Sequence, residues 1–87
     1  MDEKKTLYVN KLFIPQNSSN ISKVGVLGKD LFIQFTNGAI YKYEEAAEKY
    51  EVLSKAESVG KTVNQEVKAN FEFVKIDALT LALDSFN

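Results

Sequence analysis

Apolar and polar residues alternate in the first half of the chain with the period of about two that is typical of β-strands. TLYVNKLFIP (6–15) mixes β-branched and aromatic residues and ends at the only proline, which predicts a strand, or a strand with a bulge near Asn10. QNSSN (16–20) has the polar composition of a turn. ISKVGVL (21–27) predicts a second strand, and GKD (28–30) the turn that follows it.

The clearest local signal is LFIQFTNGAIYKY (31–43), two strand patterns joined by Asn37-Gly38. Asn-Gly predicts a two-residue type I′ turn, because this dipeptide most easily supplies two positive φ angles. Such a turn would pair Phe35 with Ile40 and Phe32 with Tyr43. Side chains of a strand alternate between faces. One face would then hold Leu31, Ile33, Phe35 and Ile40, with Lys42 at its margin, and the other Phe32, Gln34, Tyr41 and Tyr43.

The period becomes helical at residue 44. Ala46, Tyr50, Leu53 and Ala56 share one stripe and predict a main helix over 44–60. We expect this helix to begin with glutamates that suit the helix dipole, to end at Gly60, and to pack on the Leu31 face of the hairpin.

Three shorter elements follow the predicted helix. Residues 62–70 predict a short second helix or helical turn, with Thr62 as a candidate N-cap. FEFVKI (71–76) predicts a returning strand. The tail DALTLALDSFN (77–87) fits a strand or a helix, so it would add an edge strand or mediate self-association.

The amino-acid composition limits which catalytic, metal and phosphate-binding groups this chain can offer. The 87 residues include no cysteine and no histidine, which excludes disulfides, thiolate or imidazole zinc sites, and histidine-based catalysis. Residues 1–43 contain six lysines and three acidic residues, whereas residues 44–59 contain two lysines and five glutamates. All eleven basic residues are lysine, so no guanidinium is present for bidentate recognition of phosphate or guanine. We expect a cytoplasmic protein with no metal, cofactor or membrane segment.

The order of these motifs resembles the KTSC domain, a short bacterial and phage-associated domain that also occurs at the C-terminal end of some lysyl-tRNA synthetases. The resemblance spans residues 18–76, with an extra N-terminal strand (6–14) and the C-terminal tail (77–87) outside it. Its marks here are Ser18-Ser19-Asn20, Asn37-Gly38, Tyr41-Lys42-Tyr43, and Gly60-Lys61 with Asn64. The length of 87 residues predicts one domain over 1–87, and the synthetase context of the family implies RNA binding.

Tyr41 and Tyr43 have two interpretations. On an open sheet face, their rings would stack nucleic-acid bases, with lysines near the rim for phosphate. Alternatively, they pack against neighbours as ordinary sheet residues. The candidate ligand-binding residues are Tyr41, Tyr43, Phe32, Gln34, Lys42, Lys29 and Lys61.

Two further motifs have simpler explanations. SVGKT (58–62) resembles the end of a phosphate-binding loop, but Lys55 stands where that loop needs its first glycine. Glu44, Glu45 and Glu48 are explained by a helix start rather than by catalysis.

The sequence therefore predicts an α+β fold: an antiparallel meander of three or four strands, one main helix, a short helical turn and a returning strand. We expect a non-catalytic module that binds RNA, single-stranded DNA or a small nucleotide through the Tyr-x-Tyr face. The alternative is a protein-interaction module, such as a phage accessory protein that inhibits or sequesters a host factor or a nucleotide signal. The near-zero net charge and the lack of arginine favour the alternative.

Overall fold

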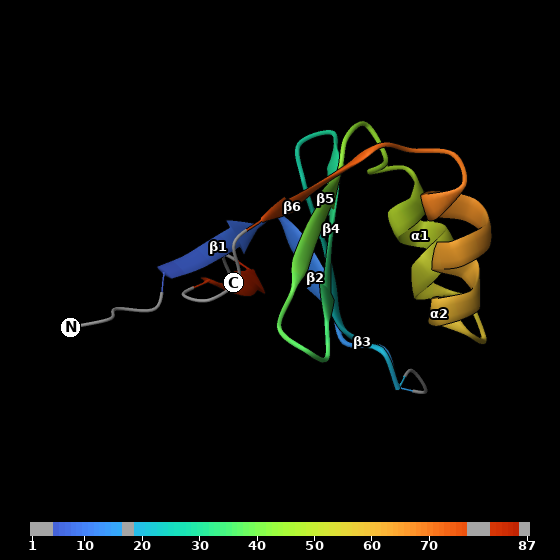
Figure 1. Ribbon diagram of the computed structural model, residues 1–87, viewed down its shortest axis with the longest axis horizontal. Helices are drawn as coiled ribbons and strands as arrows, with labels where there is room; N and C mark the ends of the chain where they lie inside the picture. The colour runs from blue at the N-terminus through green and yellow to red at the C-terminus, as the bar shows by residue number, and fades with distance from the viewer. Residues whose placement is uncertain (1–4, 17–18, 77–80, 86–87) are drawn as a thin grey trace.

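The computed structural model describes residues 5–16, 19–76 and 81–85, and it confirms the predicted α+β class. Figure 1 shows the strands and helices of this part of the chain. In chain order they are β1 (Lys5–Val9), β2 (Lys11–Phe13), β3 (Ile21–Leu27), β4 (Asp30–Phe35), β5 (Ile40–Tyr43), α1 (Lys49–Ser54), α2 (Val59–Thr62), the π-helical segment η1 (Val63–Lys68), β6 (Phe73–Ile76) and β7 (Leu81–Ser85).

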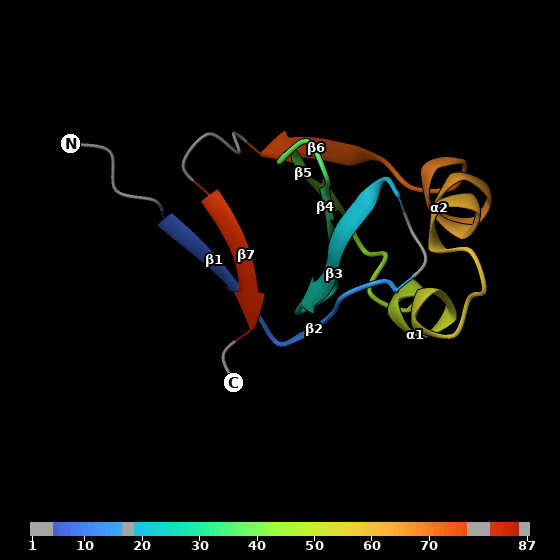
Figure 2. The ribbon, with the colours of Figure 1, turned by 90° about the horizontal axis from the view of Figure 1, so that it is seen from below.

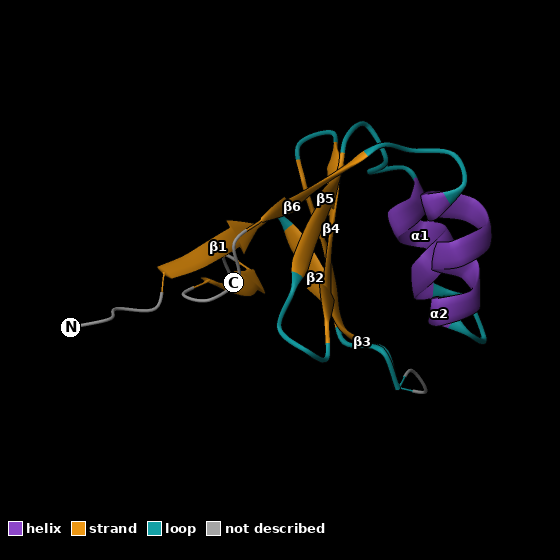
Figure 3. Ribbon diagram, viewed as in Figure 1, coloured by secondary structure: helices purple, strands orange, loops and turns teal. Residues whose placement is uncertain are grey.

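The main sheet is antiparallel, with the strand order β2-β3-β4-β5-β6. The helices cover one face, as the purple ribbons in Figure 3 show. On the opposite side, β1 and β7 pair in parallel as a separate two-stranded sheet (Figure 2). The ambiguous tail thus contributes a strand within its own chain, while residues 77–80 and 86–87 of that tail lie outside the described residues.

The β4–β5 turn differs from the predicted type I′ turn. The Phe35 N–H donates to the Ala39 carbonyl at 2.8 Å, and the Gly38 N–H donates to the Phe35 carbonyl at 2.9 Å. Gly38 has φ +95°, but Glu45 is the only described non-glycine residue with positive φ, so Asn37 stays right-handed. The Asn37 side chain instead accepts the Ala39 N–H at 3.0 Å. The turn is therefore a three-residue loop with glycine at its left-handed position.

The extra loop residue shifts the hairpin register by one, so the predicted pairing was wrong. Tyr41 lies opposite Ile33, and Tyr43 lies opposite Leu31. Directly opposed residues share a face, and a shift of one residue exchanges the faces. Both tyrosines therefore lie on the helix-covered face with Phe35, while Ile40 and Lys42 lie on the other face.

The main core fills the space between this face and the helices. Leu31, Ile33 and Tyr43 are fully buried there against Leu53 of α1 and Val63 of η1. The predicted stripe is partly confirmed, because Ala46 and Leu53 are buried and Tyr50 packs on the cluster. The expected contact with Ile40 is absent, since that side chain points to the opposite face.

The predicted helix over 44–60 is wrong in its boundaries. Residues 44–48 form a loop, because the Glu45 N–H donates to the Asp30 carboxylate at 3.2 Å and the Ala47 N–H donates to the Lys29 carbonyl at 3.0 Å. Glu45 has φ 59°, which is incompatible with a continuing right-handed helix. These glutamates therefore do not form the first turn of the helix.

The second helical region begins earlier than the predicted range of 62–70. Ser58 begins α2 as its N-cap, accepting the Lys61 N–H on its hydroxyl at 3.4 Å, and helical backbone continues through η1 to Lys68. Gly60 lies inside α2 instead of ending a helix, and Thr62, which precedes η1, makes no side-chain cap hydrogen bond. The Lys49 ammonium and the Glu66 carboxylate, 3.2 Å apart, join α1 to η1.

A second core lies on the opposite face of the sheet. Val9, at the end of β1, is fully buried with Phe32 and Ile40. The single strand predicted over 6–15 is divided at Asn10 into β1 and β2, which belong to different sheets, and the Asn10 side chain accepts the Gly28 N–H at 3.0 Å. Val9 reaches the sheet because Gly25 has no side chain: a Cβ there would lie 2.7 Å from Val9 Cγ2 and 3.1 Å from the Lys11 carbonyl oxygen.

We predict that Gly25→Ala lowers the free energy of unfolding by about 1–3 kcal/mol, because the added methyl group displaces Val9 from the second core. Gly60→Ala is the matched control, since a Cβ at Gly60 meets nothing within 4 Å and alanine is the better helix former. Urea unfolding followed by circular dichroism measures both. Equal stability of the two variants would contradict the close approach of Val9.

Candidate ligand-binding surface

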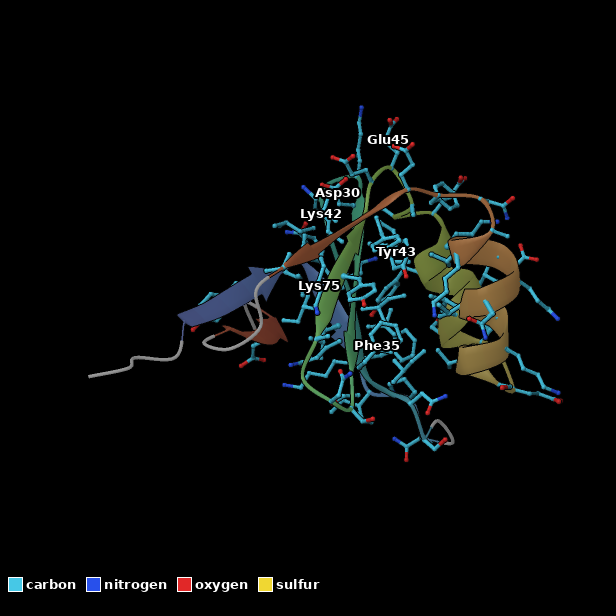
Figure 4. The ribbon with its side chains drawn as sticks, viewed as in Figure 1. Asp30, Phe35, Lys42, Tyr43, Glu45 and Lys75 are labelled. Carbon is cyan, nitrogen blue, oxygen red and sulfur yellow. The ribbon has the colours of Figure 1, made fainter. Side chains whose placement is uncertain are left out.

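The seven candidate residues do not converge on one surface. Tyr41 and Tyr43 lie on the helix-covered face of β5, while Phe32, Gln34 and Lys42 lie on the opposite face. Figure 4 shows Tyr43 directed toward the helices and Lys42 on the other side of the sheet. Lys29 lies in the β3–β4 turn and Lys61 in α2. The hypothesis that Tyr41 and Tyr43 share one face with Phe32 and Gln34 depended on the type I′ register.

The opposite face is unsuited to base stacking at the predicted positions. Phe32 is only 4% exposed, because it packs in the second core with Val9 and Ile40. Lys42 pairs with Glu44 at 3.8 Å. The ring and the lysine are thus engaged within the chain.

Phe35, Tyr41 and Phe73, which we call the aromatic cluster, gather instead on the helix-covered face near the β6 edge. The rings of Tyr41 and Phe73 stack in parallel, with centroids 5.1 Å apart and planes 6° apart. Phe35 meets Tyr41 edge to face at 5.3 Å. Phe73 is 55% exposed, and Phe35 and Tyr41 are half-buried. The helices therefore bury Tyr43 but leave the aromatic cluster accessible.

A cation and several polar groups surround the aromatic cluster. Lys68, exposed at the end of η1, places its ammonium 5.4 Å from the centre of the Phe35 ring. A pocket at the hairpin turn is lined by Asn20, Phe35, Thr36, Asn37, Ala39, Tyr41 and Lys68. Lys75, also exposed, lies opposite Tyr41 in the β5–β6 register. Aromatic faces, amides and ammonium groups together suit a planar ligand that carries negative charge.

The candidate residues taken from the sequence did not include Phe35, Phe73 or Lys68. Phe35 was assigned to the aliphatic core face, and Phe73 was seen only as part of a returning strand. The alternation of Phe71 and Phe73 was visible, but the β5–β6 register decides that Phe73 lies opposite Tyr43 and stacks diagonally on Tyr41. Lys68 reaches Phe35 only through the length of η1.

Tyr43 is the structural member of the Tyr-x-Tyr pair. Its side chain is fully buried, and its hydroxyl has no hydrogen-bond partner among the described residues. Burial, with a smaller contribution from the neighbouring Tyr41, raises the pKa of Tyr43 from 10.0 to about 12. This ring contributes packing to the core, and Tyr41 is left as the ring that a ligand can reach.

We predict that Tyr43→Phe is neutral or stabilising by about 1 kcal/mol near neutral pH, because it removes a buried hydroxyl without a partner. The advantage should grow at high pH. In the wild type, the unfolded chain loses the tyrosine proton near its ordinary pKa of 10.0, while the folded chain keeps it to about 12, so stability falls across this interval. Between about pH 8 and about pH 11.5 the difference should increase by about 2 kcal/mol.

Urea unfolding at both pH values measures this effect, and Tyr8→Phe serves as the control because Tyr8 is 46% exposed. A Tyr43→Phe variant that is less stable than the wild type at neutral pH would show that the hydroxyl has a partner.

Other site types are not evident in the described ranges. No group of three or more acidic side chains there is arranged to hold a metal ion. None of the described helices has the length and apolar character needed to cross a membrane.

The fold and this surface define a small α+β domain with an aromatic, lysine-rimmed sheet edge. The family model of the KTSC domain matches residues 17–71, well over half of the chain, and the chain belongs to this family. No curated protein matches the chain. The family match runs from before β3 through η1, so it includes Phe35, Tyr41 and Lys68 but ends before Phe73. Strands β1, β2, β6 and β7 lie outside it.

Proposed function

We propose that this chain is a non-catalytic module that binds single-stranded RNA or DNA, or a nucleotide, on the aromatic cluster. The observation that carries the proposal is the parallel stack of Tyr41 and Phe73 at 5.1 Å, together with the exposure of Phe73, which is 55%. A nucleobase could extend this stack on the free surface of Phe73. Stacking of a base on an aromatic side chain contributes about 1–3 kcal/mol and accepts any base.

Lysine ammonium groups lie where the phosphates of such a ligand would run. Lys68 is beside Phe35, and Lys75 is beside Tyr41 in the sheet register. Both lysines are exposed, so they can contact phosphate at little desolvation cost. Because the chain contains no arginine, these contacts would be single ammonium–phosphate contacts without bidentate geometry. We therefore expect weak sequence preference and strong salt dependence.

The pocket at the hairpin turn supports a base as the ligand. It places the amides of Asn20 and Asn37 and the hydroxyl of Thr36 beside the rings of Phe35 and Tyr41. Amide and hydroxyl groups can bond the edge of a base while a ring contacts its face. A small nucleotide would bind the same groups. The proposal therefore includes a protein that sequesters a nucleotide signal. We propose no catalysis, because the sequence has no histidine or cysteine to act as base or nucleophile.

Fluorescence anisotropy with labelled oligouridine and oligothymidine tests the proposal. We predict that Phe73→Ala weakens binding about 5- to 150-fold, the range that corresponds to one lost stacking contact. Tyr8→Ala is the matched control, because Tyr8 is similarly exposed but lies on β1, across the sheet.

Lys68→Ala should weaken binding and reduce its salt dependence, whereas Lys42→Ala should do neither, since Lys42 lies on the other face of the sheet.

Binding that is undetectable at about 20 mM salt would reject the nucleic-acid proposal. Titration with nucleoside monophosphates and dinucleotides would then test the small-ligand form separately. Equal losses for Phe73→Ala and Tyr8→Ala would show that the ligand does not use the aromatic cluster.

A further inference from the structure

Strand β6 is the outermost strand of the main sheet on the side of the aromatic cluster. Figure 2 shows no other described strand or helix beyond it. Phe73 is 55% exposed on one face of this strand, and Val74 is 49% exposed on the other. An open sheet edge with exposed apolar side chains on both faces is a template for pairing with another strand.

The opposite edge of the sheet is protected in a way that β6 is not. Strand β2 spans only Lys11–Phe13, and the chain then runs into Pro15, which has no N–H to donate. Strand β6 contains no proline, and its three residues from Phe73 to Lys75 are all exposed.

The direction of the β6 backbone groups follows from its pairing with β5. The Glu44 N–H donates to the Glu72 carbonyl at 3.3 Å, so Glu72 turns its backbone groups toward β5. Backbone direction alternates along an antiparallel strand. The backbone N–H and C=O groups of Val74 therefore also point toward β5, where Val74 lies opposite Lys42. Those of Phe73 and Lys75 point outward, away from β5.

We propose that β6 pairs antiparallel with β6 of a second copy of this chain, joining the two main sheets across a two-fold axis at Val74. In this register Val74 lies opposite the partner subunit's Val74, and Phe73 lies opposite the partner subunit's Lys75. The outward backbone groups of Phe73 and Lys75 then exchange four hydrogen bonds with the partner, two for each such pair. Each lysine ammonium meets an exposed phenylalanine ring, which is a favourable cation–π pairing.

The sequence of β6 selects this register over its neighbours. A two-fold axis perpendicular to the sheet requires opposed residues to lie on the same face, which excludes shifts by one residue. A register centred on Lys75 would oppose two ammonium groups, which is destabilising. A register centred on Phe73 would engage only the first residues of the strand and place Glu72 against the partner's Val74.

The occupant is a second copy because β6 complements itself. The cation and the ring of each cross-strand pair both come from this one short strand, and Val74 offers the same apolar group on both sides of the axis. A foreign strand would need to supply a cation and an apolar residue in this same order. The pairing engages Phe73 and Lys75, two residues of the proposed nucleic-acid surface, and it would bring the two aromatic clusters together at one junction.

A unique cysteine tests the pairing directly, because the wild-type chain has none. At a non-hydrogen-bonded antiparallel pair the Cα atoms lie about 4.5 Å apart, within the range that a disulfide spans. We predict that Val74→Cys forms an intermolecular disulfide rapidly under mild oxidation. Val52→Cys is the matched control, because Val52 is 44% exposed but lies on α1. We expect it to crosslink at least about tenfold more slowly, at the rate of random collision.

Light scattering and sedimentation velocity test the same contact without oxidation. Because the interface is small, we expect the wild type to dimerise only at concentrations on the order of 100 μM. Val74→Lys should shift the chain to monomer by opposing two ammonium groups at the axis, while Val52→Lys should leave the dimer intact.

Equal crosslinking rates for the two cysteine variants would overturn the proposal. A dimer that persists in Val74→Lys would also overturn it, because self-association would then use another surface, such as β1 and β7. Oligonucleotide binding by a monomeric wild type would leave the proposed function standing while rejecting the dimer.

Discussion

The hydrogen bonds that close the β4–β5 turn decide where every side chain of this hairpin points. A hydrogen bond of 2.8 Å from the Phe35 N–H to the Ala39 carbonyl closes a three-residue loop, and Gly38 takes the left-handed conformation with φ +95°. A two-residue loop would move β5 by one position and exchange its two faces. Tyr43 would then leave the main core, and Ile40 would leave the second core. The rest of the molecule is built on the register that this loop sets.

The two cores depend on each other through the central strand. Leu31, Phe32 and Ile33 are consecutive and all buried, because helices cover one face of β4 and Val9 covers the other. The loop after β5 leads from the main sheet to α1. Its backbone is bonded to the β3–β4 turn through Asp30 and the Lys29 carbonyl, so α1 begins only at Lys49. This late start places α1 beside η1, which carries Lys68 to the aromatic cluster.

Much of the fold could be predicted from sequence, but the site could not be assembled from it. The strands were found close to their observed positions because β-branched and aromatic runs are separated by glycine and polar turns. The Tyr-x-Tyr motif was correctly singled out, and Tyr41 does belong to the aromatic cluster. Its partners were misassigned, because Tyr41 stacks on Phe73, 32 positions away, as a diagonal neighbour across the β5–β6 pairing, in which Phe73 lies opposite Tyr43. No local pattern reports such a contact.

The sequence by itself determined the α+β class, membership of the KTSC family, and a chemistry limited to lysine, carboxylate, amide, hydroxyl and aromatic groups. Tertiary structure decided the register, the helix ends and which rings stay accessible. The physical reason is that both faces of β4 are buried, so the alternation of polar and apolar residues could not tell one face from the other. Likewise, glutamates and alanines at 44–48 favour a helix locally, but hydrogen bonds to a distant turn outweigh that preference.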